Sequence, residues 1–232
     1  ITLKIKICNK DIVLFGIIRI KLELFSSSNQ RLSFLRFFKL VAKPTLFLLS
    51  LSYEFISKYY LCTRNQINID MTDLTHYTSE ATTLLSALIG IPSISREEEK
   101  VADFFQNYIE ESGIMTGRSG NNIWCICPHF DLNKPTILLN SHIDTVKPVN
   151  GWRKQPFTAK IENGKLYGLG SNDAGASVVS LFQAYRHLSA TEQAYNLIFL
   201  ASCEEEVSGK NGIESVLSQL PPITLGIVGE PT

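Results

Sequence analysis

The alternation of strand-like and helix-like patterns from Met71 onward is the strongest constraint on the fold. Apolar side chains repeat at helical spacing in residues 79–90 and again in residues 101–112. Two uninterrupted apolar runs, residues 135–140 and 196–201, are typical of strands that are covered on both faces, as in a parallel sheet. The pattern predicts an α/β fold with an open, mostly parallel sheet flanked by helices.

Shorter segments complete this alternating pattern. Ser79 is a candidate N-cap for the first helix, and Gly90 and Pro92 are expected to end it. The dipeptide Asn163-Gly164 favours a type I′ turn between the two strands of a hairpin. The remaining expected elements are strands at residues 123–126, 157–161, 165–167 and 225–228, and helices near residues 178–185 and 213–219.

Composition divides the chain at Met71. Residues 1–70 contain 11 Lys and Arg against 4 Asp and Glu, a net charge of +7, whereas residues 71–232 contain 11 against 18, a net charge of −7. Of the 14 glycines only Gly16 precedes Met71, and Ala42 is the only alanine in that part. A compact domain uses both residue types throughout, so the two parts are of different kinds.

The basic part, residues 1–70, is not expected to belong to the folded domain. No methionine precedes Met71, and the apolar side chains of this part sustain neither a helical nor a strand period. We therefore expect Met71 to be the natural start, residues 1–70 to be translated upstream sequence, and residues 71–232 to be the domain. The alternative is a basic extension that binds a membrane surface or a partner.

Charge, hydropathy and cysteine usage exclude some classes of protein. A formal charge of zero rules out binding to a polyanion driven by net charge alone, so no nucleic-acid partner is expected. No apolar run approaches the roughly 18 residues that span a bilayer. Lysines also interrupt the place where a signal peptide has its apolar core. Five cysteines without scaffold-like spacing indicate a reducing setting, so we expect a cytoplasmic protein with no membrane partner.

Four polar motifs follow predicted strands or lead into a predicted helix, which is where open α/β sheets place their sites. They are Ser-His-Ile-Asp at 141–144, Gly-Leu-Gly-Ser-Asn-Asp-Ala-Gly at 168–175, Cys-Glu-Glu-Glu at 203–206 and Gly-Glu-Pro-Thr at 229–232. Residues two apart in an extended segment face the same side. Asp144 can therefore accept a hydrogen bond from His142 and fix the tautomer of its ring.

Each motif taken alone also has a structural alternative. His142 and Asp144 can form a structural pair, and Asp173 can be the N-cap of the following helix. The three carboxylates at 204–206 can form a solvated acidic turn, and Glu230 can be an ordinary loop residue. The functional interpretation therefore depends on the four motifs together.

Together the motifs supply one imidazole and several carboxylates, which suit zinc, cobalt or manganese. Two such ions about 3.5–4 Å apart need a bridging carboxylate, and they jointly activate one water and polarise an amide carbonyl. A separate carboxylate must then take the proton of the water and deliver it to the leaving amine. The adjacent residues Glu205 and Glu206 offer one carboxylate for each task.

These four motifs resemble those of the M20 family of dinuclear zinc aminoacylases and peptidases. The resemblance is greatest to acetylornithine deacetylases and succinyl-diaminopimelate desuccinylases, and it extends over residues 71–232. It implies that His142 and Glu230 bind one metal ion, that Glu206 binds the other, and that Asp173 bridges the two. It also implies two catalytic roles, with Glu205 as the general base and Asp144 as the partner that orients His142.

The resemblance implies an activity and a larger assembly. The expected reaction is metal-dependent hydrolysis of a small N-acyl amino acid, N-acetylornithine first, as in arginine biosynthesis, with two Zn²⁺ or Co²⁺ ions. A lid domain that follows Glu230 would form a homodimer, and a histidine from beyond Thr232 would complete the second metal site. The alternatives are succinyl-diaminopimelate desuccinylation, dipeptide hydrolysis, or a fragment that is inactive and only binds a metal or a partner.

Several further polar residues fall outside this expected site. Glu204 is assigned no catalytic role, and Cys203 is not expected to bind a metal. His76 and His187 are expected to be surface or packing residues. The string Cys125-x-Cys127-x-His129 could hold a metal, but alternation along a strand accounts for it better.

Overall fold

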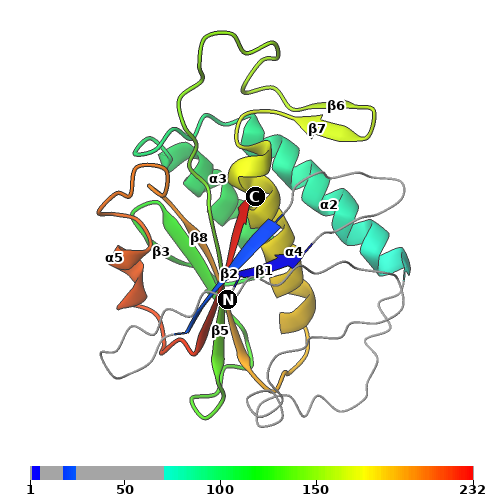
Figure 1. Cartoon of the computed structure of the whole chain (residues 1–232). Coiled ribbons are helices and arrows are strands. Elements are labelled where there is room, and N and C mark those ends of the chain that lie inside the picture. Colours follow the sequence, from blue (N-terminus) through cyan, green and yellow to red (C-terminus); the bar gives the residue numbers. More distant parts are fainter. Residues whose placement is uncertain (1, 6–17, 25–70, 232) are drawn as a thin grey trace.

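The computed structural model describes residues 2–5, 18–24 and 71–231, and side chains from residue 75 onward. In this part of the chain a seven-stranded sheet with the order β1-β2-β9-β5-β8-β4-β3 forms the centre of the fold (Figure 1). Its strands are β1 Thr2–Ile5, β2 Ile18–Leu24, β3 Gly117–Ser119, β4 Asn122–Ile126, β5 Thr136–His142, β8 Asn196–Ser202 and β9 Leu225–Pro231. The predicted α/β class is confirmed.

The three central strands are parallel, as the two long apolar runs predict. Strand β5 pairs in parallel with both β8 and β9, and all seven residues of β8 are buried. The flanking strands are antiparallel: β4 pairs with β8, β3 with β4, β2 with β9 and β1 with β2. The sheet is therefore mixed, with a parallel centre.

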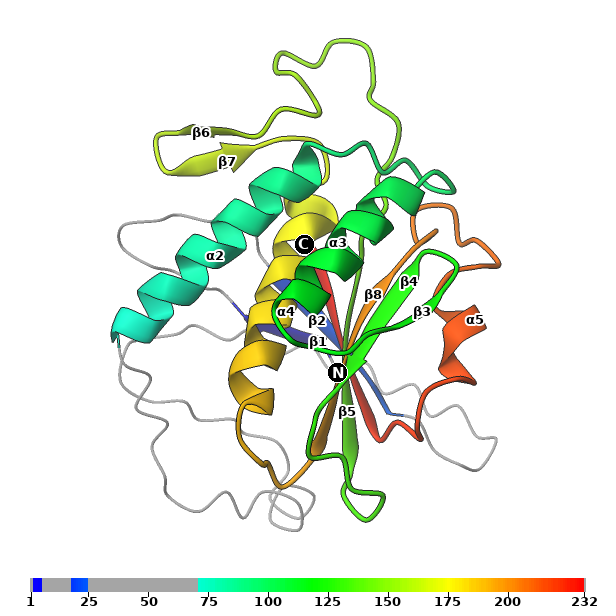
Figure 2. The same cartoon turned by 180° about the vertical axis from the view of Figure 1, so that it is seen from behind.

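Helices cover both faces of the sheet. Helices α2 (Met71–Ile89), α3 (Glu99–Glu111) and α4 (Ala176–Ser189) lie together on one face, and the short helix α5 (Glu214–Leu217) lies apart from them (Figure 2). Neighbouring residues of β5 point to opposite faces, so Leu139 packs into the larger core under the three helices and Leu138 into the smaller core with α5. Both cores hold the central strands in register.

The two ends of helix α2 test the predicted boundaries of the first helix. Helix α2 ends at Ile89, just before Gly90, as predicted. Its start differs, because the helix begins at Met71 and the predicted N-cap Ser79 lies inside it. The hydroxyls of this segment bond back to carbonyls four residues earlier, as Thr83 does to Ser79, so the helix accommodates them without a cap.

A hairpin stands apart from the main sheet. Strands β6 (Lys160–Glu162) and β7 (Lys165–Tyr167) form a separate two-stranded sheet. Asn163 and Gly164 both have positive φ, 52° and 71°, which a type I′ turn requires at its two central residues. The predicted turn is confirmed, whereas the first strand begins at Lys160, later than predicted. The hairpin belongs to a long connection from β5 to α4 that projects beyond the sheet (Figure 1).

The basic N-terminal part is described only in two short strands. Strand β2 adds to the edge of the sheet beside β9, with Ile18 opposite Pro231 and Leu24 opposite Leu225. The expectation that residues 1–70 are not part of the domain stays a prediction, because most of them lie outside the described residues. In the described part of the chain, no helix is long and apolar enough to cross a membrane.

Candidate metal centre

The register of the central strands brings three of the four motifs to one edge of the sheet. In the β5–β8 pairing His142 lies opposite Ser202, so the residues after each strand are neighbours. In the β5–β9 pairing Asn140 lies opposite Val228, which places Glu230 beside the end of β5. The fourth motif leads into α4 at the same edge (Figure 1). The carboxyl ends of parallel strands are where this class of sheet carries its sites.

His142 is the buried centre of this group. Its side chain is 1% exposed, and Nδ1 lies 3.0 Å from the carbonyl oxygen of Asp144 and 3.2 Å from its carboxylate. These contacts match the predicted pairing and fix a proton on Nδ1. The other ring nitrogen, Nε2, faces the remaining carboxylates and lies 3.1 Å from Oδ1 of Asp173.

Asp173 does not cap the helix that follows it. It lies in a short π-helical segment, η1 (Ser171–Gly175), and α4 begins only at Ala176. The backbone of Asp173 is non-helical, and its bond to Ala174 is cis. The carboxylate is about half exposed and points to His142. The N-cap alternative is therefore wrong, because this segment holds the carboxylate at the edge of the sheet.

The donor set of the site fits a divalent metal ion. One ligand atom each from His142, Asp173 and Glu206 lie within 4.8 Å of one another. Among residues 75–231, no other group of three His, Cys, Asp or Glu side chains meets that spacing. An imidazole with two carboxylates is a ligand set for zinc and related ions. The structure thus brings together three of the four predicted metal ligands at coordinating range.

Glu230 and Glu205 lie at the border of this group. The distance from Nε2 of His142 is 3.7 Å to a carboxylate oxygen of Glu230 and 3.8 Å to one of Glu205. Glu230 comes from β9 and Glu205 from the loop after β8, so they approach the imidazole from different strands. All the residues predicted for the site therefore converge on His142.

Asp144 holds the loop that carries Glu205 and Glu206. It is fully buried, and its two carboxylate oxygens accept the backbone N–H groups of Glu205 and Glu206, each at 3.1 Å. Ser95 donates its hydroxyl to the same carboxylate at 2.7 Å. Asp144 thus orients both His142 and the acidic loop. Ser95, 49 residues away in sequence, was missed because no local pattern links it to the site.

The charges of the site shift the pKa of its members in opposite directions. Burial disfavours the imidazolium of His142, but the hydrogen bonds that its ring donates to Asp144, Asp173 and Glu230 outweigh this and raise its pKa to about 12. Burial would raise the pKa of Asp144, yet its bonds with His142 and Ser95 lower it. The carboxylates thus stabilise a positive charge at their centre.

The pKa values of Glu205 and Glu206 are both raised. Burial raises the pKa of Glu205, and repulsion from Glu230 and the two aspartates adds to this against the attraction of His142. Burial and repulsion from Asp173 likewise raise the pKa of Glu206. Carboxylates that repel one another in this way are stabilised by a shared cation.

Glu204 faces away from this site. Its carboxylate is buried and accepts both the backbone N–H and the side-chain amide of Asn211, at 3.3 and 2.7 Å. Its own N–H bonds to Oε1 of Glu98, a fully buried carboxylate that also accepts the N–H of Arg96 and the side-chain amide of Asn121. The prediction that Glu204 is not part of the site agrees with this geometry. Glu98 was missed, because it reads as one of three surface glutamates.

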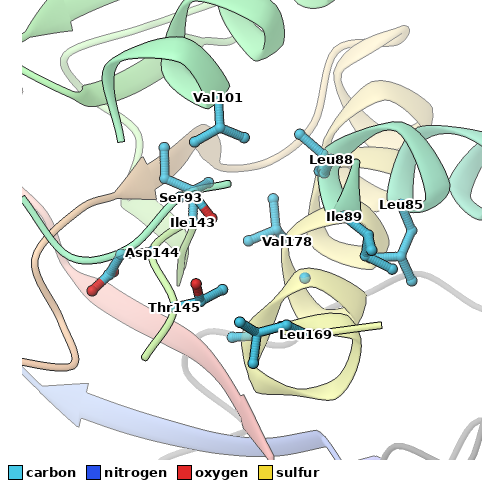
Figure 3. Close-up of a pocket in the computed structure, with 13 residues that line it drawn as sticks. Leu85, Leu88, Ile89, Ser93, Val101, Ile143, Asp144, Thr145, Leu169 and Val178 are labelled. Carbon is cyan, nitrogen blue, oxygen red and sulfur yellow. The ribbon is translucent and has the colours of Figure 1, made fainter. Parts of the chain in front are cut away.

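A small cavity lies beneath the site. It has a volume of about 30 Å³, and the side chains of Leu88, Ile89, Leu169 and Val178 surround it (Figure 3). Asp144 lies at its border. A volume near that of one water molecule is too small for a substrate, so this cavity is not a binding cleft.

The other histidines and the paired cysteines lie away from the site. His76 pairs with Glu80 within α2, and His187 lies near the hydroxyl of Tyr77. Cys125 and Cys127 are both buried in the larger core, whereas His129 is exposed. Only Cys125 lies within β4, which ends at Ile126, so the predicted alternation along a strand does not extend to His129.

Comparison with known proteins gives relatives for the region of the site. Two curated relatives named succinyl-diaminopimelate desuccinylase match, one from Buchnera aphidicola subsp. Cinara cedri and one from Blochmanniella floridana. The first is 35% identical over 161 residues, covering 64% of this chain and 42% of the relative. The second is 26% identical over 163 residues, covering 65% and 42%. The chain thus spans about two fifths of the length of these relatives.

A solved structure supports the fold. Human carnosine dipeptidase 1 superposes with a TM-score of 0.51 over 64% of this chain and 36% of its own, at 19% sequence identity. At that identity the match concerns the architecture of the sheet and its helices. The sequence profile of Peptidase family M20/M25/M40 matches residues 138–232, which contain all four motifs. This segment, which carries His142, Asp173, Glu206 and Glu230, is therefore similar to peptidase family M20.

Proposed function

We propose that the complete protein hydrolyses the amide bond of a small N-acyl amino acid with the help of two divalent metal ions. The observation that carries the proposal is the convergence of His142, Asp173 and Glu206 within 4.8 Å at the carboxyl edge of a parallel sheet. The match of residues 138–232 to the profile of peptidase family M20 supports it. The relatives that match over this region are named as enzymes that remove an acyl group.

The metal ligands would divide between two ions, for which zinc and cobalt fit the donor set. His142 and Glu230 would bind one ion, Glu206 the other, and Asp173 both. Bound there, the ions would activate a water and polarise the amide carbonyl. Asp144 keeps the proton of His142 on Nδ1, so Nε2 is free to bind a metal.

Glu205 would transfer the proton in this reaction. It lies in contact range of the site and is about half exposed, so a water and a substrate can reach its carboxylate. Its raised pKa suits a group that must first accept a proton from the water and then give it to the leaving amine. Asp144 fixes its backbone, so the carboxylate remains beside the metal ligands.

Three candidate substrates differ in the group that is removed from the amine. N-acetylornithine, the substrate predicted from sequence, stays a prediction. The curated relatives are named for removal of a succinyl group, and this specific observation favours N-succinyl-diaminopimelate as a second candidate. Dipeptides are a third, because the structural relative is named a carnosine dipeptidase.

The rest of the protein would complete this site. In the proposed organisation, residues 71–232 are the N-terminal portion of the catalytic domain and residues 1–70 do not contribute to it. A lid domain would join two copies into a homodimer in the cytoplasm, and a further histidine would complete the second metal site. Expression from Met71 tests the first boundary, because loss of folding in the shortened chain would show that residues 1–70 are needed.

The activity is tested with the full-length protein and either Zn²⁺ or Co²⁺. N-acetylornithine, N-succinyl-diaminopimelate and a dipeptide are offered in parallel, and the free amine released is measured. Metal-dependent hydrolysis of one of them is expected, and Glu205→Gln should lower kcat while leaving metal content unchanged. If no acyl amino acid or dipeptide is hydrolysed with metal supplied, the chain has a binding role instead.

A further inference from the structure

A second concave site lies beside the metal centre, in the long connection between β5 and α4. This hollow of about 340 Å³ is lined by Trp152, Arg153, Lys154, Tyr167, Gly168 and Ser171. Its volume lies within the range of small-molecule sites, roughly 300–1,000 Å³. Ser171 begins segment η1, which also carries Asp173, so the hollow and the metal centre share a structural element.

The connection that forms the hollow is strongly basic, in contrast to the centre beside it. Residues 146–168 contain five Lys and Arg residues and one acidic residue, Glu162, so their net charge is +4. The metal centre gathers five carboxylates around one histidine. A substrate that binds at the acidic centre through its neutral amide could therefore carry a negative group that is held by the neighbouring basic segment.

The cationic side chains of the hollow differ in how they are paired. The ammonium of Lys154 is bonded to Glu162 and lies 3.9 Å from the centroid of the Tyr167 ring, so it is fixed in place. Arg153 is exposed, and its side chain forms no ion pair or hydrogen bond within residues 75–231. Its guanidinium can therefore make a bidentate pair with a carboxylate without breaking a contact in that part of the chain.

The remaining walls suit the carbon chain of a small acid. Trp152 and Tyr167 supply aromatic surface, and Gly168 is packed so closely against Ile89 of α2 that a side chain there would overlap it. The wall at Gly168 is thus fixed to the main core. An aromatic wall with one unpaired guanidinium is a combination that orients a short carboxylic acid.

We propose that this hollow binds a carboxylate of the substrate while the scissile amide lies at the metal centre. The proposal rests on the proposed function and adds to it the place where a carboxylate of the substrate binds, with Arg153 as the group that recognises it. The carboxylate can lie on either side of the amide, on a dicarboxylic acyl group or on the amino acid. Both sources present the same planar anion to the guanidinium.

Binding can be measured without metal and without turnover. The full-length protein in a chelator is titrated at constant ionic strength, and the fluorescence of Trp152 is followed. Trp124, the other tryptophan, packs beside the smaller core around α5, and a Trp152→Phe variant shows how much of the signal it contributes. The probes are three small amides. N-methylsuccinamate carries its carboxylate on the acyl side, N-acetylglycine carries it on the amine side, and N-methylacetamide has none.

We expect saturable quenching by at least one of the two carboxylates and none by N-methylacetamide. Which carboxylate binds identifies the side of the amide that carries the charge. Arg153→Gln should raise the dissociation constant about tenfold, the effect of losing one charge-assisted pair. Lys147→Gln is the matched control, because it removes the same charge from the same connection without altering the lining, and it should change binding less than twofold.

Three results would overturn the proposal. They are the absence of saturable quenching by either carboxylate, equal binding of N-methylacetamide, and equal weakening by the Arg153 and Lys147 substitutions. The proposed function is judged separately by hydrolysis with metal. Hydrolysis without carboxylate binding would overturn only the anion site, and carboxylate binding without hydrolysis would overturn only the proposed activity.

Discussion

Two groups of carboxylates lie on opposite sides of the turn after β8, and they are stabilised in opposite ways. On one side, the buried carboxylates of Glu98 and Glu204 accept N–H groups from the backbone and from asparagine side chains. On the other side, Asp173, Glu205 and Glu206 surround the single imidazole of His142 and are partly exposed. Residues adjacent in sequence thus belong to different environments.

The difference shows which carboxylates need a cation. A buried carboxylate whose oxygens accept amide hydrogens has its charge satisfied by fixed dipoles, so it can hold a loop together without a metal. Carboxylates that face one another lack such donors, and their repulsion is relieved only by protons or by a shared cation. The first group is therefore structural, and the second surrounds the candidate metal centre.

The backbone of the turn separates the two groups. Glu204 has a positive φ of 54°, which turns its side chain away from those of the two residues that follow. Gly209 passes so close to this side chain that a Cβ there would overlap the Glu204 carboxylate. The N–H of Gly209 also bonds to the carbonyl of Glu204 at 2.9 Å. The turn is closed on the side of Glu204 and open on the side of the metal centre.

The largest expected effect is the loss of metal binding in Asp173→Ala. If Asp173 bridges two ions, its removal should weaken metal affinity by more than about a hundredfold, since changes behind the ligands alone cost 10–100-fold. Bound zinc or cobalt per chain, measured after dialysis, reports this. Asp103→Ala, in an exposed ion pair with Arg118, is the control. Unchanged metal stoichiometry in Asp173→Ala would remove this residue from the site.

Glu98→Ala should give the next largest effect, on stability. It leaves the N–H groups of Arg96 and Glu204 without their acceptor, and we expect the free energy of unfolding to fall by about 2–4 kcal/mol. Urea unfolding in the presence of a chelator measures this change without a contribution from metal. Glu97→Ala, at an exposed neighbour, should lie within about 0.5 kcal/mol of the parent. Equal losses in both variants would show that Glu98 is not a buried anchor.

Asp144→Asn should have an intermediate effect on metal binding, because Asp144 holds the loop that carries Glu205 and Glu206. The substitution replaces one carboxylate oxygen, which accepts hydrogen bonds, by an NH₂ group, which donates them. This group would then face the hydroxyl of Ser95 or the N–H groups of Glu205 and Glu206, so the acidic loop and His142 are less well oriented. We expect metal affinity to fall about tenfold, at the lower end for a residue that positions ligands. Isothermal titration with Zn²⁺ measures it, with the partly exposed Asp131→Asn as control. If affinity is retained while stability falls, Asp144 only supports the fold.

The sequence predicts the parts of this arrangement that depend on local pattern. The apolar runs of β5 and β8 predict a parallel centre, and polar residues directly after them predict where a site lies, because strand ends meet at one edge. The turn at Asn163-Gly164 follows from its two residues alone. These features need no knowledge of contacts between distant segments.

Other parts depend on distant contacts and could not be predicted. Glu98 stands in a run of three glutamates, and only the approach of the turn after β8 makes it a buried acceptor. Ser95 reaches Asp144 across 49 residues. The predicted start of α2 was wrong because Ser and Thr are common N-cap residues. In the structure their hydroxyls instead donate to backbone carbonyls within the helix. Tertiary contacts determine each of these outcomes.

The smallest expected effect concerns a third kind of carboxylate, one that is exposed and paired with cations. Hydrogen bonds from Lys154 and Lys160 lower the pKa of Glu162 to about 2. Because this pKa is below its ordinary value of 4.5, the contribution of the pair to stability is fully present above about pH 4.5 and is lost as the pH falls toward about 2. The midpoint of urea unfolding of Glu162→Gln at pH 7 should nevertheless stay close to that of the parent, since exposed ion pairs contribute little.

Carboxyl NMR titration and unfolding at pH 7 and pH 3 test this prediction separately. The titration should show the lowered pKa of Glu162, and the small difference between Glu162→Gln and the parent should shrink further at pH 3. A loss of stability at pH 7 comparable to that of Glu98→Ala would contradict the comparison, because an exposed pair would then match a buried acceptor. A negligible effect would show that burial with amide donors, and not negative charge itself, makes Glu98 and Glu204 structural.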